Sequence, residues 1–280
     1  MQVQWYPGHM TKAKRMMQEN IKLIDLIIEV LDARCPLASR NPDIDELGQN
    51  KARLILLNKS DLSDDAINQS WAEWFGEQGM FTVMIDARSG SGIKSIQNAI
   101  ASACREKIER DRKRGILNRP VRAMVVGIPN VGKSTLINSL AGKACAKTGN
   151  KPGVTKGKQW IRLNKNVELL DTPGLLWPKF EDEKVGLHLA MIGSVNDEIL
   201  DVTELSCELL IKIRSQKPGQ IANRYGIDEN GSAYELLEKI AKARGCLKKG
   251  EELDTGKAAM IVLDEFRSGK IGRISLESPN

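Results

Sequence analysis

The sequence contains no hydrophobic run long enough to cross a membrane. A membrane-spanning helix needs roughly 20 consecutive apolar residues, and the most apolar stretch, Ile24 to Leu31, already contains Asp25 and Glu29. The first residues, MQVQWYPGHM, also lack the basic start and apolar core of a secretory signal. These absences predict a cytoplasmic protein without a membrane partner.

Cysteine and histidine are too few and too scattered to build a metal site. The five cysteines form no C-x-x-C pair, and the sequence contains 2 histidines. Zinc sites and disulfide frameworks need clustered or paired residues of these types. The sequence therefore argues against both.

Acidic residues are scarce in the middle of the chain. The formal net charge is +6, but between Arg105 and Lys165 sixteen basic residues stand against three acidic ones. Residues 201–280, in contrast, carry 13 basic and 13 acidic residues. A solvated charged helix explains part of the run, in the segment REKIERDRKRG, but the excess continues beyond it. We therefore expect a polyanionic partner for this stretch.

Length and periodicity predict two domains. A chain of 280 residues is long enough for two, and short apolar segments alternate with helical patterns in its first part, which is typical of a doubly wound α/β sheet. Buried parallel strands are predicted over residues 26–31, 53–57, 82–85 and 122–126, and a hairpin over 159–163 and 167–170. Helices are predicted over residues 11–25, 64–75, 93–114 and 133–141.

From about residue 184 onward, helical patterns replace the strand pattern. Ser232 to Glu235 forms a capping box that opens a helix, and residues 257–266 form another. The apolar face of the first of these helices consists of Leu236, Leu237, Ile240 and Ala241. With a boundary between Pro178 and Glu183, we predict an α/β domain over residues 1–180 and a smaller all-α domain over residues 181–280.

A glycine-rich loop with the Walker A pattern separates a predicted strand from a predicted helix. It runs from Gly127 to Ser134 with the sequence GIPNVGKS, in the strand–loop–helix context that a phosphate-binding loop requires. In such a loop, backbone N–H groups wrap the phosphates at a helix N-terminus, Lys133 reaches the β and γ oxygens, and the Ser134 hydroxyl ligates Mg²⁺. The pattern predicts a nucleoside triphosphate as ligand.

Three further motifs follow predicted strands. Asn58 to Asp61 (NKSD) offers a carboxylate that accepts the N1 and N2 protons of guanine, which favours GTP over ATP. Asp86 to Arg88 (DAR) fits the companion loop, with a backbone N–H around Ala87 facing guanine O6. Asp171 to Gly174 (DTPG) places a carboxylate near Mg²⁺ and an N–H at the γ-phosphate. Each alone fits a structural turn, but together with the P-loop they predict a GTP site.

These motifs resemble those of Ras-like GTPases, in a different order. The NKSD motif precedes the P-loop, where ordinary GTPases place it after, so the chain resembles a circularly permuted GTPase. With Tyr6–Met10 (YPGHM), Asp32–Pro36 (DARCP), Ser39–Pro42 (SRNP) and Pro152–Thr155 (PGVT), it resembles the bacterial ribosome biogenesis GTPase A family over essentially its whole length. The resemblance implies GTP hydrolysis coupled to late assembly of the large ribosomal subunit, with rRNA and not DNA as the nucleic-acid partner.

The motifs and the resemblance together assign residues to the site. Those expected to bind GTP are Asn58, Lys59, Asp61, Asp86, Ala87, Arg88, Asn130, Val131, Gly132, Lys133, Ser134, Thr135, Thr155 and Gly174. The expected Mg²⁺ ligands are Ser134, Thr155 and, through a water molecule, Asp171. Asn130 either coordinates a K⁺ ion that stabilises the transition state or caps a loop turn, and the sequence leaves both open.

The glutamine that orients the attacking water in Ras is missing. Its position, directly after DTPG, holds Leu175, whose aliphatic side chain neither donates nor accepts a hydrogen bond. His188 lies in an apolar helical pattern that favours a packed histidine, whereas His9 lies in a Pro-Gly turn within a family motif. We therefore predict His9 as the water-orienting residue, with Lys133, Thr155 and Gly174 completing the catalytic set.

Other functions are compatible with a P-loop. A nucleotide kinase would need lid arginines and an acceptor pocket and would not need the NKSD motif, and a degenerate binding module conflicts with intact Lys133, Ser134, Thr155 and Asp171. A GTPase that acts on tRNA or at a membrane surface stays open beside the ribosomal interpretation.

Overall fold

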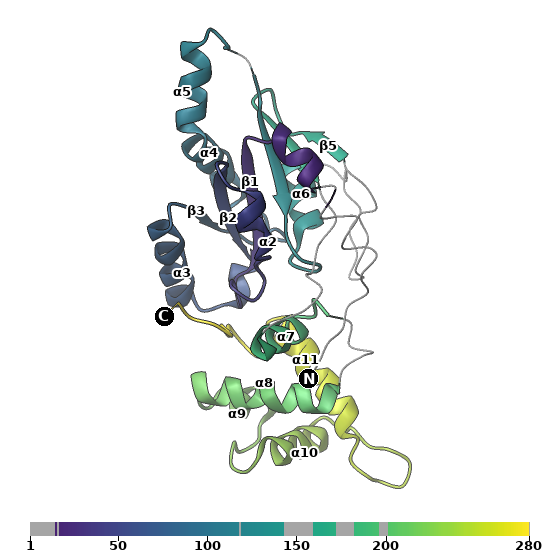
Figure 1. The fold of residues 1–280 in the computed structure, drawn as a ribbon. Coiled ribbons are helices and arrows are strands. Elements are labelled where there is room, and N and C mark those ends of the chain that lie inside the picture. The colour runs from purple at the N-terminus through teal and green to yellow at the C-terminus, as the bar shows by residue number, and fades with distance from the viewer. Residues whose placement is uncertain are drawn as a thin grey trace.

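The computed structural model describes Arg15 and residues 17–117, 119–142, 159–171, 182–195 and 201–279 of the chain. A sheet flanked by helices forms one part of the molecule, and the helices after residue 182 form the other (Figure 1). The C-terminal segment leaves the last helix and returns to the sheet part beside α3.

The sheet has six strands in the order β3-β2-β1-β4-β6-β5. They are β1 (Leu26–Asp32), β2 (Ala52–Asn58), β3 (Phe81–Met84), β4 (Val121–Val126), β5 (Gln159–Arg162) and β6 (Val167–Asp171). Neighbouring strands are parallel except β5, which pairs with β6 as an antiparallel hairpin. The strand and hairpin predictions are confirmed. The expectation that residues 82–85 are buried is wrong in part, because β3 lies at a sheet edge, where Met84 is 37% exposed, whereas Ile85 is buried.

Helices cover both faces of the sheet. They are α2 (Asp43–Leu47), α3 (Asp65–Glu77), α4 (Ile93–Ala103), α5 (Arg105–Lys113) and α6 (Lys133–Ala141). Successive strand residues point to opposite faces. In β1, Ile28 and Val30 therefore join the buried cluster that includes α4 and α6, whereas Leu31 packs with Trp71 of α3 on the other face. This arrangement confirms the doubly wound α/β class.

Two helix predictions need correction. The single helix predicted over residues 93–114 is broken at Cys104, whose φ of −100° and ψ of 12° lie outside the helical region while its side chain is buried. The helix predicted over residues 11–25 ends earlier, in a 3₁₀ turn at Ile21–Leu23, because Ile24 is extended and leads into β1. The part of that helix before Arg15 lies outside the described residues.

The second part of the molecule is helical. It contains α7 (Glu183–Met191), α8 (Val202–Gln216), α9 (Gln220–Tyr225), α10 (Ala233–Ala243) and α11 (Thr255–Arg267), and α8 contacts the other four. The predicted capping box is confirmed: Ser232 Oγ accepts from the Glu235 N–H, and the Glu235 carboxylate accepts from the Ser232 N–H. No helix in the described part of the chain is long and apolar enough to cross a membrane.

The C-terminal segment after α11 ties the helical part to the sheet part. Ile274 N–H donates to Leu62 O at 3.0 Å, and Leu276 N–H donates to Arg34 O at 2.6 Å. The Glu277 carboxylate accepts from the backbone N–H of Leu37 at 2.8 Å, from that of Ala38 and lies 3.0 Å from Nδ1 of His188. The predicted domain boundary near residue 180 falls outside the described residues and stays a prediction, but the two parts share one core cluster.

We predict that Glu277→Ala destabilises the protein by about 1–3 kcal/mol, because two backbone N–H groups and His188 lose their acceptor. Urea unfolding should show a lower midpoint. The matched control is Glu208→Ala, which removes an exposed glutamate from α8 and should change stability by no more than about 0.5 kcal/mol. Equal midpoints for the two variants would contradict the role of this contact.

Candidate functional site

The predicted nucleotide-binding motifs meet at one edge of the sheet. β1, β2, β4 and β6 are parallel, so the residues at their carboxyl ends lie side by side. The P-loop follows β4, the NKSD motif follows β2, and Asp86 follows β3. Strand order reverses between β1 and β4, and in open α/β sheets ligands bind at such a reversal. The structure thus brings together motifs that are far apart in the sequence.

The P-loop has the backbone shape that phosphate binding requires. Gly132 precedes α6 with a φ of 90°, and a Cβ at this position would lie 2.3 Å from Asn58 Nδ2. A Cβ at Gly127 would lie 2.7 Å from Val30 O, so both positions need glycine. Lys133 and Ser134 occupy the first turn of α6, where the backbone N–H groups of a helix N-terminus and the helix dipole favour a bound phosphate.

Asn58 connects the P-loop to the loop at residues 86–88. Its Nδ2 donates to Val131 O at 2.6 Å, and its Oδ1 accepts from the Ala87 N–H at 3.0 Å. Ser139 of α6 also donates to Ala87 O, at 2.8 Å. Because the Ala87 N–H is bonded to Asn58, its predicted contact with guanine O6 is not preformed and stays a prediction.

Lys59 and Asp32 form an ion pair that contacts the P-loop. Lys59 has a left-handed backbone conformation, and its Nζ donates to Asp32 Oδ2 at 2.9 Å and to Asn130 O of the P-loop at 2.7 Å. Asp32 also accepts from Nε and Nη2 of Arg34 at 2.9 and 2.8 Å. Burial raises the pKa of Asp32, but the charges of Arg34 and Lys59 outweigh it and hold that pKa well below its usual range. The family resemblance includes Asp32 in the DARCP motif but assigns it no role. Its position at the end of a predicted buried strand was the sequence feature that could have indicated a role in the site.

Asp61 and Asp86 lie at the expected guanine end of the site. Asp61 is exposed, and partial burial together with the charge of Asp86 raises its pKa above the ordinary value. Asp86 accepts from the N–H groups of Arg88 at 2.9 Å and Ser89 at 3.2 Å, which shapes the loop. An exposed carboxylate beside a shaped loop can accept the two edge protons of guanine.

The predicted catalytic and metal residues are only partly described. His9, Thr155 and Gly174 lie outside the described residues. Asp171 ends β6 with its Cα paired to that of Val125 in β4, which places it next to the strand that leads into the P-loop and Ser134. Hydroxyl and carboxylate oxygens are ligands that Mg²⁺ prefers, so Ser134 and Asp171 fit that ion, with Thr155 as the third predicted ligand.

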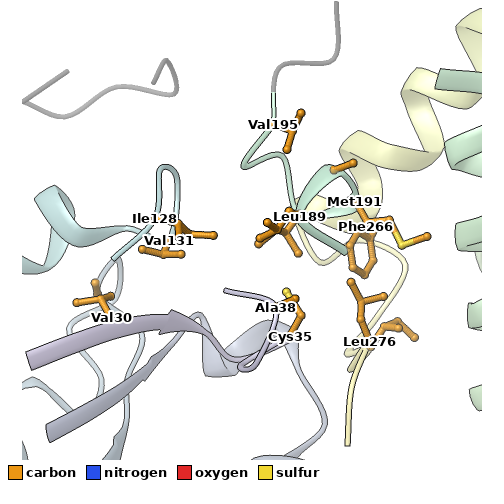
Figure 2. Close-up of a cluster of buried hydrophobic side chains, with 14 of the residues drawn as sticks. Val30, Cys35, Ala38, Ile128, Val131, Leu189, Met191, Val195, Phe266 and Leu276 are labelled. Carbon is orange, nitrogen blue, oxygen red and sulfur yellow. The ribbon is translucent and has the colours of Figure 1, made fainter. Parts of the chain in front are cut away.

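The P-loop is hydrogen-bonded to the turn that follows α7 in the helical part. Asn130 Nδ2 donates to Gly193 O at 2.6 Å, and Ser194 Oγ donates to Pro129 O at 2.8 Å. Figure 2 shows Leu189 of α7 between Ile128 at the P-loop and Phe266 of α11. The nucleotide site and the helical part are therefore continuous through the buried core.

His188 is confirmed as a packed helix residue. It is 7% exposed on α7. Its Nδ1 lies 3.0 Å from Glu277 Oε1, and its Nε2 lies 2.7 Å from Lys212 Nζ. Both ring nitrogens are thus engaged within the protein.

The fold and the site define a GTPase with circularly permuted motifs. A family model described as 50S ribosome-binding GTPase matches residues 122–234. Ribosome biogenesis GTPase A from Bacillus cereus is 47% identical over 100% of this chain and 95% of its own, and that from Thermotoga maritima is 34% identical over 98% and 94%. The chain belongs to the ribosome biogenesis GTPase A family and is a GTP hydrolase.

Solved structures agree with this assignment. A GDP-bound YlqF structure matches with a TM-score of 0.70 and 30% identity, over 95% of this chain and 99% of the other. GNP-bound YlqF from Thermotoga maritima matches with a TM-score of 0.68 and 31% identity, over 96% and 99%. The chain therefore shares its fold with a protein whose structures were solved with GDP and with GNP bound.

We predict that Asp61→Asn weakens GDP binding by roughly tenfold or more, because two hydrogen bonds to a charged acceptor are lost. The variant should instead gain affinity for xanthosine diphosphate, whose 2-carbonyl accepts from the new amide. Isothermal titration with both nucleotides checks this, and thermal melting confirms the fold. Unchanged preference for guanine would remove Asp61 from the specificity pocket.

Proposed function

We propose that this GTPase acts in the cytoplasm in late assembly of the large ribosomal subunit. It binds rRNA and hydrolyses GTP once it is correctly docked. The observation that carries the proposal is the match of the whole chain to ribosome biogenesis GTPase A proteins together with an intact P-loop. The matching family model, whose description includes binding to the 50S ribosome, supports the choice of subunit.

The distribution of basic side chains supports an RNA partner. Within α5, Arg105 pairs with Glu109 and Lys107 pairs with Asp111, so these charges are partly neutralised inside the helix. The cations at the end of α5 are exposed, namely Arg110, Arg112, Lys113 and Arg114. Clustered cations that displace counterions from phosphates supply sequence-independent affinity for nucleic acid.

Contact between the P-loop and α7 supports communication between GTP and the helical part. Asn130 and Pro129 bond to Gly193 and Ser194 at the end of α7. Any adjustment of the P-loop on binding or losing the γ-phosphate reaches α7 through these two bonds. We infer that the helical part, over the predicted residues 181–280, contacts the ribosomal particle and receives this signal.

The client is tested by GTP turnover of the purified protein alone and with large subunits, small subunits or tRNA, in K⁺ buffer. We expect large subunits alone to raise turnover, by roughly tenfold or more, since docking completes the catalytic arrangement. Stimulation by small subunits or tRNA would assign another client. Absence of stimulation with GTP still bound would overturn the ribosomal proposal and leave the GTPase intact.

A potassium requirement follows if Asn130 coordinates a monovalent cation that offsets charge in the transition state. We expect turnover in K⁺ to exceed that in Na⁺ at equal ionic strength, and Asn130→Ala to abolish the difference. Ser194→Ala is the matched control, because it removes the neighbouring bond to Pro129 and leaves Asn130 in place. Equal rates in both salts would contradict K⁺ coordination by Asn130, and its side chain would then have only the structural role of bonding to Gly193.

His9 is proposed to orient the attacking water. His9→Ala should leave GDP affinity unchanged and reduce subunit-stimulated turnover by roughly 10²-fold or more, the usual contribution of a positioned acid–base group. Single-turnover measurements separate the chemical step from product release. Wild-type turnover in this variant would remove His9 from the mechanism.

A further inference from the structure

An exposed tryptophan lies on β5, the strand at one edge of the sheet. β5 ends the strand order, and Trp160 on it is 40% exposed, whereas the next residue, Ile161, is buried in the core on the opposite face. Trp160 and Arg162 are two residues apart in the same strand and therefore point to the same face. The GTPase site described above uses neither.

Arginine side chains surround this tryptophan. Arg122 of β4 and Arg162 of β5 both pair in register with Glu168 of β6, so the three lie in one row across the sheet. The guanidinium of Arg122 lies 5.4 Å from the centroid of the Trp160 ring, and its Nε donates to Glu168 at 3.3 Å. The row therefore holds two positive charges and one negative charge beside a partly exposed aromatic ring, with Arg122 over one of its faces.

These side chains line a groove of about 410 Å³. Its lining consists of Leu23, Arg122, Trp160, Arg162 and Glu168. Leu23, from the 3₁₀ turn before β1, is 48% exposed and adds an apolar wall. The groove thus combines an aromatic platform, an apolar wall and an excess of positive charge.

We propose that this groove binds single-stranded RNA, with an unpaired base stacked on Trp160 and the adjoining phosphate paired with Arg162. Aromatic rings and guanidinium planes are the surfaces on which unpaired bases stack. A protein strand added to the edge of β5 would use backbone groups and would not need the charged face that Arg122 and Arg162 form. The proposal rests on the proposed function, in which RNA is the partner.

Binding of a fluorescently labelled oligo(A) strand, alone or annealed to oligo(U), tests the groove by anisotropy. Trp160→Ala should weaken single-strand binding by roughly fivefold to 100-fold, the effect of losing one stacked base, and Trp160→Phe should retain most of it. Arg162→Ala should weaken binding and lower the salt slope by about one phosphate contact. The annealed strand should show less dependence on Trp160, because its bases are already stacked.

Two matched controls accompany these variants. Phe81→Ala removes an exposed aromatic ring from the strand at the opposite sheet edge. Arg105→Ala removes an exposed arginine, 79% accessible, from the same basic stretch. Phe81→Ala should bind oligo(A) like the wild type, Arg105→Ala should lose less affinity than Arg162→Ala, and all variants should bind GDP normally.

Equal losses in Trp160→Ala and Phe81→Ala would overturn the proposed groove. So would wild-type RNA affinity in Trp160→Ala combined with weaker binding to large subunits, since that result assigns the groove to a protein. GTP turnover measured with large subunits distinguishes failure of the proposed groove from failure of the proposed function. If the wild type is stimulated and Trp160→Ala binds RNA normally, only the groove fails, whereas an unstimulated wild type contradicts the proposed function itself.

Discussion

The structure depends on one buried carboxylate, that of Asp32 at the end of the central strand. It is fully buried and accepts hydrogen bonds from Arg34 and Lys59. Lys59 continues to the P-loop carbonyl of Asn130. Arg34 continues to the helical part, since its guanidinium lies 5.0 Å from the Phe266 ring and its carbonyl accepts from Leu276. The Asp32 carboxylate is therefore connected, through Lys59 and Arg34, to the P-loop and to the helical part.

The energetics of this cluster are asymmetric. Burying an ion pair gives little net stability, because desolvation offsets the attraction, but removing one partner leaves an uncompensated charge and costs about 3–5 kcal/mol. The lowered pKa of Asp32 fixes the sign of the pH dependence. Its contribution to stability is fully present above the unfolded-state pKa of about 3.9 and is lost as the pH falls toward the folded-state pKa. At neutral pH Asp32 is therefore ionised, and its contribution to the stability of the folded state is fully present.

Local signals in the sequence were sufficient for most of the fold. The strands, the P-loop context and the capping box at Ser232 depend on neighbouring residues, and the structure confirms them. Prediction failed at two places. Cys104, whose side chain lies in the core, has non-helical φ and ψ within a continuous helical pattern. β3 is partly exposed because it lies at the edge of the strand order.

Part of the site was also beyond local patterns. The contact of Asn58 with the nucleotide stays a prediction, but its amide also bridges Val131 and Ala87, which are distant in the sequence and were not predicted as its partners. Glu277 caps the N–H groups of Leu37 and Ala38 from the other end of the chain. A single sequence carries no signal for such pairs, because each depends on how the sheet and the helical part pack together.

The contact between the P-loop and α7 sets a thermodynamic constraint on any signal in this protein. If GTP binding favours one arrangement of the Asn130–Gly193 contact, it can shift that equilibrium only by its differential affinity for the two arrangements. A ribosomal particle that binds the helical part could favour the same arrangement. It must then strengthen GTP binding by the same factor by which GTP strengthens docking to the particle. If GDP lacks this preference, hydrolysis removes the added affinity for the particle. In that case release needs no contact beyond the bonds that join the P-loop to the turn after α7.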